Sequence, residues 1–555
     1  MTEYGDIAKL LKATAASGDW WRDGMTGKIY LAMGAATLAL FGPVSDKGGP
    51  SLAEAMQPSA EPASLSSAQG ATRCNGFVGK QVAGATVDKT EFIAAGSALP
   101  PFGSKNVPEF CRVHARIAPV DGSEIKLQVW LPTNWNGKFV GFGGAGFEGG
   151  LAFSAVSLKG PVGKGYAAVV TNAGHDPTFV PTWALGQPEK IVDFGHRANH
   201  LGAIFGKALS ADYYGTAVKR AFFQGCSNGG RDALMLAQRY PDDYDAIVAG
   251  APANDFTGLM ASFARIGRLA RATPVADTLG PKLKLVHEAA IAKCDGLDGL
   301  RDGLIDRPAA CRFDPAVLQC KGAAGASCLS KSEVGTVKAI YRGTYDRQGR
   351  EIMPGLPVGS EYEWEAWLTG AKAGGPGMAT NLMRYMVYSD PAWSPENFDL
   401  DRDFAASRRF PGQAIDAVNP DLRPFFGRGG KLLMYHGWDD AAIPAGNSLR
   451  YHAAVQRSVG RRAEEHVRLF MLPGVAHCDG GHGPDTIDYL EALDRWAGSG
   501  TAPEALVAIK YDNPVALKTG QPAHVVRSRL ACAWPKKAKY KGSGSIDDAA
   551  NFTCR

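Results

Sequence analysis

The sequence of 555 residues lacks a dominant charge of either sign. Its 60 Lys and Arg residues nearly balance 55 Asp and Glu residues, which leaves a formal net charge of +5. Its one dense basic cluster, formed by Lys536, Lys537, Lys539 and Lys541, is typical of a solvated terminal segment. Because nucleic-acid binding depends on basic patches that neutralise phosphates, nucleic acid is not an expected partner.

The sequence also lacks an apolar run long enough to cross a membrane, and it has no internal repeat. The run from Ile29 to Pro43 is too short for a bilayer core. Lys28 precedes this run and Ala53-Glu54-Ala55 follows it, which is the pattern of a secretory signal peptide with its cleavage site. We therefore expect export and no membrane span.

Cysteine, by contrast, is plentiful. The ten cysteines are even in number and do not follow the short repeated spacings of zinc sites. They predict five disulfides and hence an oxidising compartment, so we expect a secreted or periplasmic protein. We expect residues 1–70 to comprise an upstream extension before Met25, the signal peptide, and a flexible leader over residues 56–70.

The next part of the chain alternates strand-like and helix-like segments, which predicts an α/β fold with a mostly parallel sheet. Strands are expected at residues 125–131, 138–142, 166–171, 221–224 and 245–250, and helices at residues 196–209 and 231–239. We expect residues 71–253 to form the first part of this core.

The alternation stops at about residue 254 and resumes near residue 429. The intervening segment is rich in aromatic residues, including Trp364, Trp367, Trp393 and Phe398. Further strands are expected at residues 431–435 and 467–472, and helices at residues 445–455 and 484–496. The simplest interpretation is one α/β core, completed by residues 429–555, that is interrupted by a large inserted lid domain at residues 254–428.

A candidate nucleophile follows the predicted strand at residues 221–224. Ser227 lies in Gly225-Cys226-Ser227-Asn228-Gly229, which matches the nucleophile elbow of α/β-hydrolases. The five-residue pattern alone is also met in ordinary glycine-rich turns. The buried strand before it and the helical run after it favour the catalytic interpretation.

Two cysteines connect this serine to a candidate base. Cys478 directly follows His477, and if Cys226 and Cys478 pair, disulfide geometry brings Ser227 and His477 into contact range. A histidine can activate a serine hydroxyl by removing its proton. The third member of such a site is an acid between them in the chain, and both Asp439 and Asp440 are candidates.

On these residues, the chain from about residue 74 to residue 555 resembles the tannase and feruloyl esterase family. The most specific marks are the Cys-Ser and His-Cys dipeptides joined by a disulfide. The resemblance implies an α/β-hydrolase fold and an acid four residues after a His-Gly histidine. In His436-Gly437-Trp438-Asp439-Asp440 that acid is Asp440, although Asp439 stays an alternative.

Ester cleavage also needs N–H donors for the developing oxyanion. One should be the backbone N–H of Asn228, directly after the serine. The other should come from the glycine-rich turn at residues 141–146, where the resemblance points to Gly144, with Gly143 close behind.

An acidic loop at residues 295–306 is the candidate metal site. Its carboxylates repel one another unless a cation or neighbouring arginines offset them, and hard oxygen ligands suit Ca²⁺. The spacing alone fits a solvated acidic turn equally well. The resemblance favours structural calcium, held by the side chains of Asp295, Asp298 and Asp302 and the backbone carbonyls of Leu300 and Leu304.

Disulfide connectivity cannot be chosen from spacing alone. The resemblance implies the pairs Cys74 with Cys111, Cys226 with Cys478, Cys294 with Cys311, Cys320 with Cys328, and Cys532 with Cys554.

These inferences predict a serine carboxylesterase that works through an acyl-enzyme and needs no organic cofactor. The resemblance implies a small ester of an aromatic acid as substrate, such as a feruloyl, hydroxycinnamoyl or galloyl ester, including one attached to plant cell-wall polysaccharide. Two alternatives remain open. A mono(2-hydroxyethyl) terephthalate hydrolase would need a lid arginine for the free carboxylate, with Arg265, Arg268, Arg271 and Arg384 available. A non-catalytic, calcium-stabilised secreted binding protein is the second.

Overall fold

The computed structural model describes residues 64–99, 107–147, 149–178, 180–272, 275–370, 372–514 and 522–555. The predicted signal peptide and residues 56–63 of the expected leader lie outside the described residues. The rest of that leader is ordered rather than flexible, because helix α3 (Ser67–Asn75) begins within it and Gly70 is buried. Within the part of the chain that is described, no helix is long and apolar enough to cross a bilayer.

The core of the molecule is a ten-stranded sheet in the order β1-β2-β3-β4-β6-β5-β7-β8-β11-β12. Its strands are β1 (Gln81–Val82), β2 (Ala85–Ile93), β3 (Phe110–Ile117), β4 (Ile125–Pro132), β5 (Lys138–Phe142), β6 (Ala167–Thr171), β7 (Arg220–Cys226), β8 (Ala246–Gly250), β11 (Lys431–Gly437) and β12 (Val467–Leu472). In this order across the sheet, each pair from β1 as far as β6 is antiparallel. Each pair after β6, which includes β5, is parallel. The mostly parallel sheet predicted from the sequence is therefore present, with an antiparallel extension at one edge.

Helices cover both faces of this sheet, because its central strands are apolar on both sides. On one face pack α7 (Ala198–Tyr214), α8 (Asn228–Arg239) and α17 (Ala445–Val459). On the other face pack α5 (Lys159–Gly163) and α19 (Tyr489–Ser499). The shorter helices of this part are α3 (Ser67–Asn75), α4 (Leu151–Ser154), α6 (Pro188–Val192), α16 (Arg423–Gly427) and α18 (Ala463–His466).

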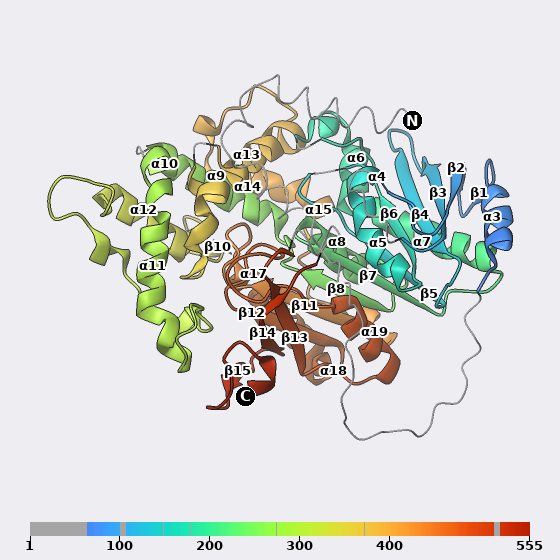
Figure 1. Cartoon of the computed structure of the whole chain (residues 1–555). Helices are drawn as coiled ribbons and strands as arrows, with labels where there is room; N and C mark the ends of the chain where they lie inside the picture. Colours follow the sequence, from blue (N-terminus) through green and yellow to red (C-terminus); the bar gives the residue numbers. More distant parts are fainter. Residues whose placement is uncertain are drawn as a thin grey trace.

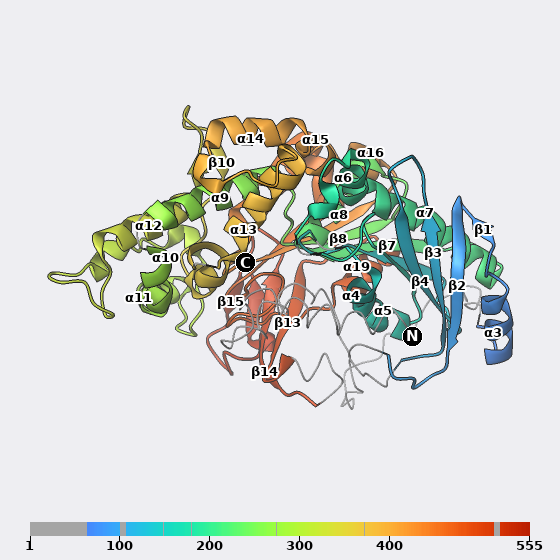
Figure 2. The same cartoon turned by 90° about the horizontal axis from the view of Figure 1, so that it is seen from above.

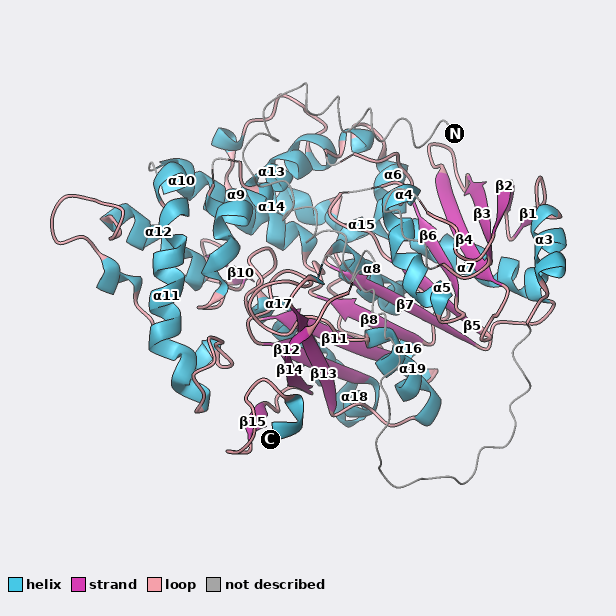
Figure 3. Ribbon diagram, in the orientation of Figure 1, coloured by secondary structure: helices cyan, strands magenta, loops and turns pink. Residues whose placement is uncertain are grey.

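Between β8 and β11 the chain forms a largely helical lid, as Figure 3 shows. Its elements are α9 (Phe256–Ala272), α10 (Val275–Thr278), α11 (Leu283–Cys294), α12 (Lys331–Arg342), β9 (Thr344–Tyr345), β10 (Glu351–Met353), α13 (Gly374–Asn381), α14 (Leu400–Arg409) and α15 (Gly412–Ile415). Its aromatic residues Trp364, Trp393 and Phe398 belong to a second hydrophobic core, which the lid shares with Phe147 and Phe194 of the α/β core. In Figures 1 and 2, the lid lies at the opposite end of the molecule from β1, β2 and α3.

The C-terminal residues add two antiparallel hairpins. One pairs β13 (Ala505–Tyr511) with β14 (Val525–Cys532), and the other pairs β15 (Ala538–Tyr540) with β16 (Phe552–Cys554). The Arg529 side chain of β14 reaches the acidic loop of the lid and binds Asp302 at 2.6 Å. The chain terminus therefore supports the far side of the lid.

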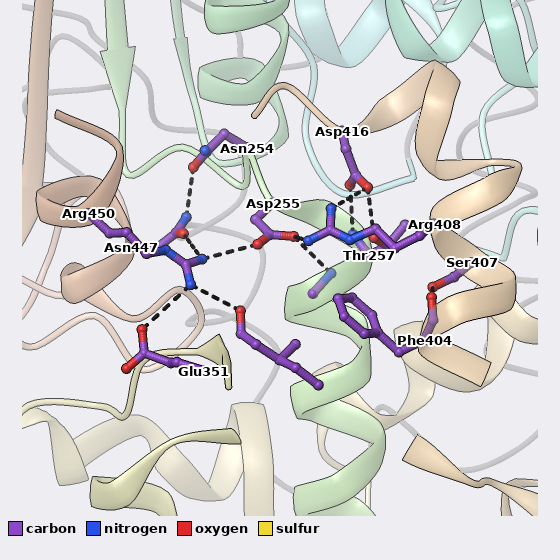
Figure 4. A network of polar contacts seen from close by, with 12 residues as sticks. Asn254, Asp255, Thr257, Glu351, Phe404, Ser407, Arg408, Asp416, Asn447 and Arg450 are labelled. Carbon is purple, nitrogen blue, oxygen red and sulfur yellow. Dashed lines mark hydrogen bonds and ion pairs between the residues drawn. The ribbon is translucent and has the colours of Figure 1, made fainter. Parts of the chain in front are cut away.

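A network of two buried aspartates and two partly exposed arginines joins the points where the lid leaves and rejoins the core (Figure 4). Asp255, just before α9, accepts from Arg408 of α14 at 2.7 Å and from Arg450 of the core helix α17 at 3.0 Å. Arg408 also binds Asp416, just after α15, at 2.7 Å. The Asp255 carboxylate thus links the lid to α17, the helix that follows Asp439 and Asp440 in the chain.

Candidate active site

Ser227 occupies a strained turn between β7 and α8. Its φ is 63° and its ψ is −124°, a conformation that a residue with a side chain rarely adopts. A β-carbon on Gly225 would lie 2.3 Å from the Gly229 carbonyl oxygen, so the turn excludes a larger residue there. This is the geometry of a nucleophile elbow, which exposes the serine hydroxyl at the carboxyl edge of the sheet.

Three loops at that edge bring together the residues that the sequence selected. Ser227 follows β7, Asp440 follows β11 and His477 follows β12. The His477 Nε2 lies 2.9 Å from Ser227 Oγ, and its Nδ1 lies 2.8 Å from Asp440 Oδ2. Because the carboxyl ends of parallel strands meet at one edge, residues far apart in the chain form one hydrogen-bonded row. That row can pass a proton from the hydroxyl to the imidazole.

The Asp440 carboxylate is buried and surrounded by donors. Its Oδ1 accepts from the backbone N–H groups of Ala442 and Ile443, each at 2.8 Å. Burial would raise the pKa of Asp440, but His477 and His436 favour the charged form and hold the pKa well below its usual value. Burial would likewise lower the pKa of His477, but the Asp440 charge and hydrogen bond raise it above its usual value. The pair thus favours a charged carboxylate beside a basic imidazole.

Asp439 has a different environment, although it is the adjacent residue. Its backbone N–H donates to the Val475 carbonyl at 2.9 Å, and His477 Nδ1 is bonded to Asp440 instead. Burial, with Glu361 and Glu363 nearby, raises the pKa of Asp439 well above its usual value. A carboxyl whose charged form is disfavoured is a poor partner for an imidazolium. Because His477 Nδ1 contacts Asp440, the geometry favours Asp440 over Asp439.

His436 is a fully buried contact of Asp440 that the sequence analysis did not assign. Its Nε2 lies 3.1 Å from Asp440 Oδ2 and 3.0 Å from the Ile443 carbonyl, and its Nδ1 lies 2.7 Å from Ser448 Oγ. With two acceptors facing Nε2, this nitrogen carries the hydrogen and donates. The sequence motif could have pointed to this role of His436, because His436 is the first residue of the motif from which Asp440 was chosen.

The five disulfides of the structure are the pairs that the resemblance implied, and no cysteine of the described residues is free. Cys226 and Cys478 have Cα atoms 5.9 Å apart although 252 residues separate them in the chain. This bridge joins the residue before Ser227 to the residue after His477. It is the one of the five that spans the candidate nucleophile and base.

The two expected oxyanion donors lie on facing segments. Asn228 begins α8 and is buried. The glycine-rich turn follows β5, and a β-carbon on Gly143 would lie 2.5 Å from Gly229 Cα, so the turn packs directly on the elbow. The Gly144 N–H donates to Asp232 Oδ2 at 3.2 Å. A Gly144 donor would therefore share its hydrogen between this carboxylate and an oxyanion.

The lid contributes an aromatic side chain to this site. Trp367 contacts the His477 ring edge to face, with centroids 5.4 Å apart. Two of the lid arginines considered for binding a free carboxylate have other partners: Arg268 donates to the Phe398 carbonyl, and Arg384 donates to the Trp393 carbonyl at 2.8 Å. Both guanidinium groups hold lid backbone.

The acidic loop lies between the lid and the C-terminal hairpins. Asp295 accepts from the backbone N–H groups of Asp302 and Gly303, and Asp298 accepts from that of Leu300. Within the ranges that the structure describes, no three His, Cys, Asp or Glu side chains gather as a metal-binding group. One cavity is nevertheless lined by Asp298, Asp302, Leu304 and Asp306, together with Arg529 and Lys537 of the C-terminal segment.

We expect the Cys226–Cys478 bridge to matter more for turnover than a lid disulfide of similar chemistry. Replacing both cysteines with alanine should lower kcat on the order of 100-fold, because a displacement of about 1 Å between reacting groups has an effect of this size. Replacing Cys320 and Cys328, which close a loop of 8 residues within the lid, is the matched control. The measurement is kcat at a temperature where circular dichroism shows both variants folded, and equal losses would contradict the prediction.

Comparisons with known proteins identify the family and agree with this fold. A sequence model of the tannase and feruloyl esterase family matches residues 111–555. A probable feruloyl esterase B-2 from Aspergillus terreus is 33% identical, with 80% of this chain and 86% of the relative covered. The mono(2-hydroxyethyl) terephthalate hydrolase of Piscinibacter sakaiensis is also 33% identical, with 81% of this chain and 85% of the relative covered.

Solved structures of similar proteins have the same fold. The crystal structure of feruloyl esterase B from Aspergillus oryzae superimposes with a TM-score of 0.80 at 28% identity, over 87% of this chain and 99% of that one. The tannin acyl hydrolase of Aspergillus niger superimposes with a TM-score of 0.72 at 22% identity, over 89% of this chain and 96% of that one, which supports the fold. The chain belongs to the tannase and feruloyl esterase family and is a carboxylic ester hydrolase.

Proposed function

We propose that this protein is a serine esterase that cleaves esters of aromatic acids through an acyl-enzyme. Ser227 attacks the ester carbonyl while His477 takes its proton and then returns it to the leaving alcohol. Asp440 orients the imidazole and stabilises its cation. Water, activated by the same imidazole, then releases the aromatic acid.

The observation that carries this proposal is the hydrogen-bonded row from Ser227 Oγ through His477 to Asp440, with spacings of 2.9 and 2.8 Å. The strained backbone at Ser227 supports it, since such strain is retained where function needs it. The aromatic acid is supported by the feruloyl esterase names of similar proteins and by Trp367 beside the imidazole.

A substrate panel tests this proposal. We expect hydrolysis of methyl ferulate or methyl gallate, and covalent labelling of the wild-type enzyme by a fluorophosphonate at Ser227. Mono(2-hydroxyethyl) terephthalate is the third substrate. Arg268 and Arg384 are engaged by lid carbonyls, so we expect this ester to be cleaved less efficiently unless Arg265, whose buried Nη1 has no hydrogen-bond partner among the described residues, binds its free carboxylate. Preference for the terephthalate ester would reassign the substrate, and absence of both labelling and hydrolysis would favour a binding protein.

We further propose that the acidic loop binds structural calcium. The carboxylates of Asp298, Asp302 and Asp306 line one cavity, and calcium accepts backbone carbonyls as well as carboxylates. Such an ion would offset the repulsion within the loop and join it to the C-terminal hairpins. The five disulfides support an exported protein that folds in an oxidising compartment. An exported esterase would reach aromatic esters on plant cell-wall polysaccharide as well as small soluble esters.

Removal of calcium is expected to destabilise the folded protein. Calcium at about 100 times its Kd stabilises by about 2.7 kcal/mol, so the melting temperature should fall by several degrees in EGTA and recover with added calcium. Asp298→Asn should abolish this dependence, whereas Asp242→Asn, at a largely exposed acid, should preserve it. Equal melting curves with EGTA and with calcium, recorded by calorimetry, would contradict calcium binding.

A further inference from the structure

One ion pair of the elbow helix is almost completely buried. Arg231 and Asp232 are adjacent on α8, and their side chains are 0% and 4% exposed. Charges removed from water are unfavourable unless they are paired and their hydrogen bonds are satisfied. An aliphatic pair would fill this space at a lower desolvation penalty. The contacts of these two side chains should therefore show what a charged pair does here that an aliphatic pair could not.

The guanidinium of Arg231 uses all five of its N–H groups. Nε donates to Asn228 Oδ1 at 2.6 Å. The terminal nitrogens donate to Asp232 Oδ1 at 2.6 Å and to the carbonyls of Phe194, Gly195 and Ile415 at 2.9, 2.7 and 3.3 Å. Arg231 therefore fixes the side chain of the residue directly after the nucleophile to the segment before α7 and to the end of the lid.

The carboxylate of Asp232 reaches the other side of the site. Its Oδ1 accepts from Arg231, and its Oδ2 accepts the Gly144 N–H at 3.2 Å. The same Oδ2 would lie 3.0 Å from a β-carbon on Gly143, so the carboxylate fits closely against the glycine-rich turn. The two halves of the ion pair thus bind the two segments that carry the expected oxyanion donors.

The charges of the pair also bear on the reaction. An unpaired carboxylate bound to the Gly144 peptide would oppose negative charge forming on a nearby ester oxygen. Arg231 neutralises Asp232 at 2.6 Å, so the carboxylate can anchor the turn while adding little net negative charge. A neutral hydrogen-bond acceptor could anchor the turn less firmly, because charged acceptors form the stronger bonds.

We propose that Arg231 and Asp232 are positioning residues that set the distance between Asn228 and the glycine-rich turn and so build the oxyanion hole. This inference rests on the proposed esterase function. It predicts an effect on the transition state that exceeds the effect on substrate binding, because donors in the oxyanion hole act mainly when charge develops.

The test compares Arg231→Met with Lys282→Met, which breaks a second well-buried pair, Lys282 with Glu333 at 2.9 Å, within the lid. Loss of one oxyanion donor lowers kcat by about 10²- to 10³-fold, so we expect Arg231→Met to lower kcat per fluorophosphonate-labelled serine by roughly 100-fold. KM should stay within about threefold, and affinity for an aryl boronic acid should fall with kcat. Lys282→Met should lower the melting temperature but leave kcat per labelled serine nearly unchanged.

A second variant keeps the test decisive if Arg231→Met does not fold. Asp232→Asn has the same shape and retains an acceptor for the Gly144 N–H, and we expect about a tenfold loss of kcat and of boronic acid affinity. Adding Asp232→Asn to Arg231→Met should restore part of the lost turnover, because it removes the unpaired carboxylate. If Asp232→Asn keeps full kcat and full boronic acid affinity, the inference is overturned while the esterase function stays intact. A wild-type protein that is neither labelled nor active would instead overturn the proposed function, and the inference with it.

Discussion

Replacement of Ser227 with alanine is expected to lower kcat on the order of 10⁶-fold, because the attacking oxygen is lost and the residues of such a site act as one unit. His477→Ala should lower kcat by a similar factor, since the Ser227 hydroxyl lies 2.9 Å from the imidazole that would remove its proton. The double variant should lose little more than either single variant, as expected for one chemical step. Steady-state hydrolysis of methyl ferulate measures all three.

Covalent labelling separates loss of chemistry from loss of folding. Ser227→Ala should give no fluorophosphonate adduct, and mass spectrometry of the wild-type adduct should locate it on Ser227. The folded fraction is followed by the melting curve, which should change little, because a serine hydroxyl at the exposed side of the elbow makes few packing contacts. Retention of labelling or of more than about 1% of the activity in Ser227→Ala would contradict a serine mechanism at this site.

Asp440→Asn is expected to lower kcat by roughly 10³- to 10⁴-fold, because the amide no longer stabilises the imidazolium and favours the wrong tautomer. Asp439→Asn is the matched control at the neighbouring position. Burial, with Glu361 and Glu363 nearby, raises the pKa of Asp439 and disfavours its charged form, so the amide should change kcat by less than about tenfold. Equal losses in the two variants would mean that both acids, or neither, act on His477.

The pH profile gives an independent check on the same pair. His477 must be neutral to act as a base, so kcat/KM should fall as the pH drops through its pKa, which lies above the usual value. In Asp440→Asn burial is no longer opposed by the Asp440 charge, and the pKa of His477 should fall. The acidic limb of the profile should therefore move to lower pH, and an unchanged limb would contradict the assignment of Asp440.

Local patterns predicted much of the sheet. Strands β4, β5, β11 and β12 begin at the residues where the sequence predicts them. Alternation of apolar and polar residues predicts β4, and short apolar runs predict the other three. The helix expected at residues 484–496 begins instead at Tyr489. Thr486 pairs with Ile509 and the Asp485 carboxylate accepts the Gly480 N–H, so long-range contacts hold the first residues outside the helix.

The sequence by itself determined the order of Ser227, the acid and His477 along the chain, and the cysteines beside the first and last of them. These features are local, because each follows from residue type and immediate neighbours. Only the tertiary structure decided which of two adjacent aspartates faces the imidazole, and that His436 shares the chosen carboxylate. It also placed Arg231 and Asp232 between Asn228 and Gly144. The physical reason is that neighbouring side chains leave a turn in different directions, and their partners come from strands and loops distant in sequence.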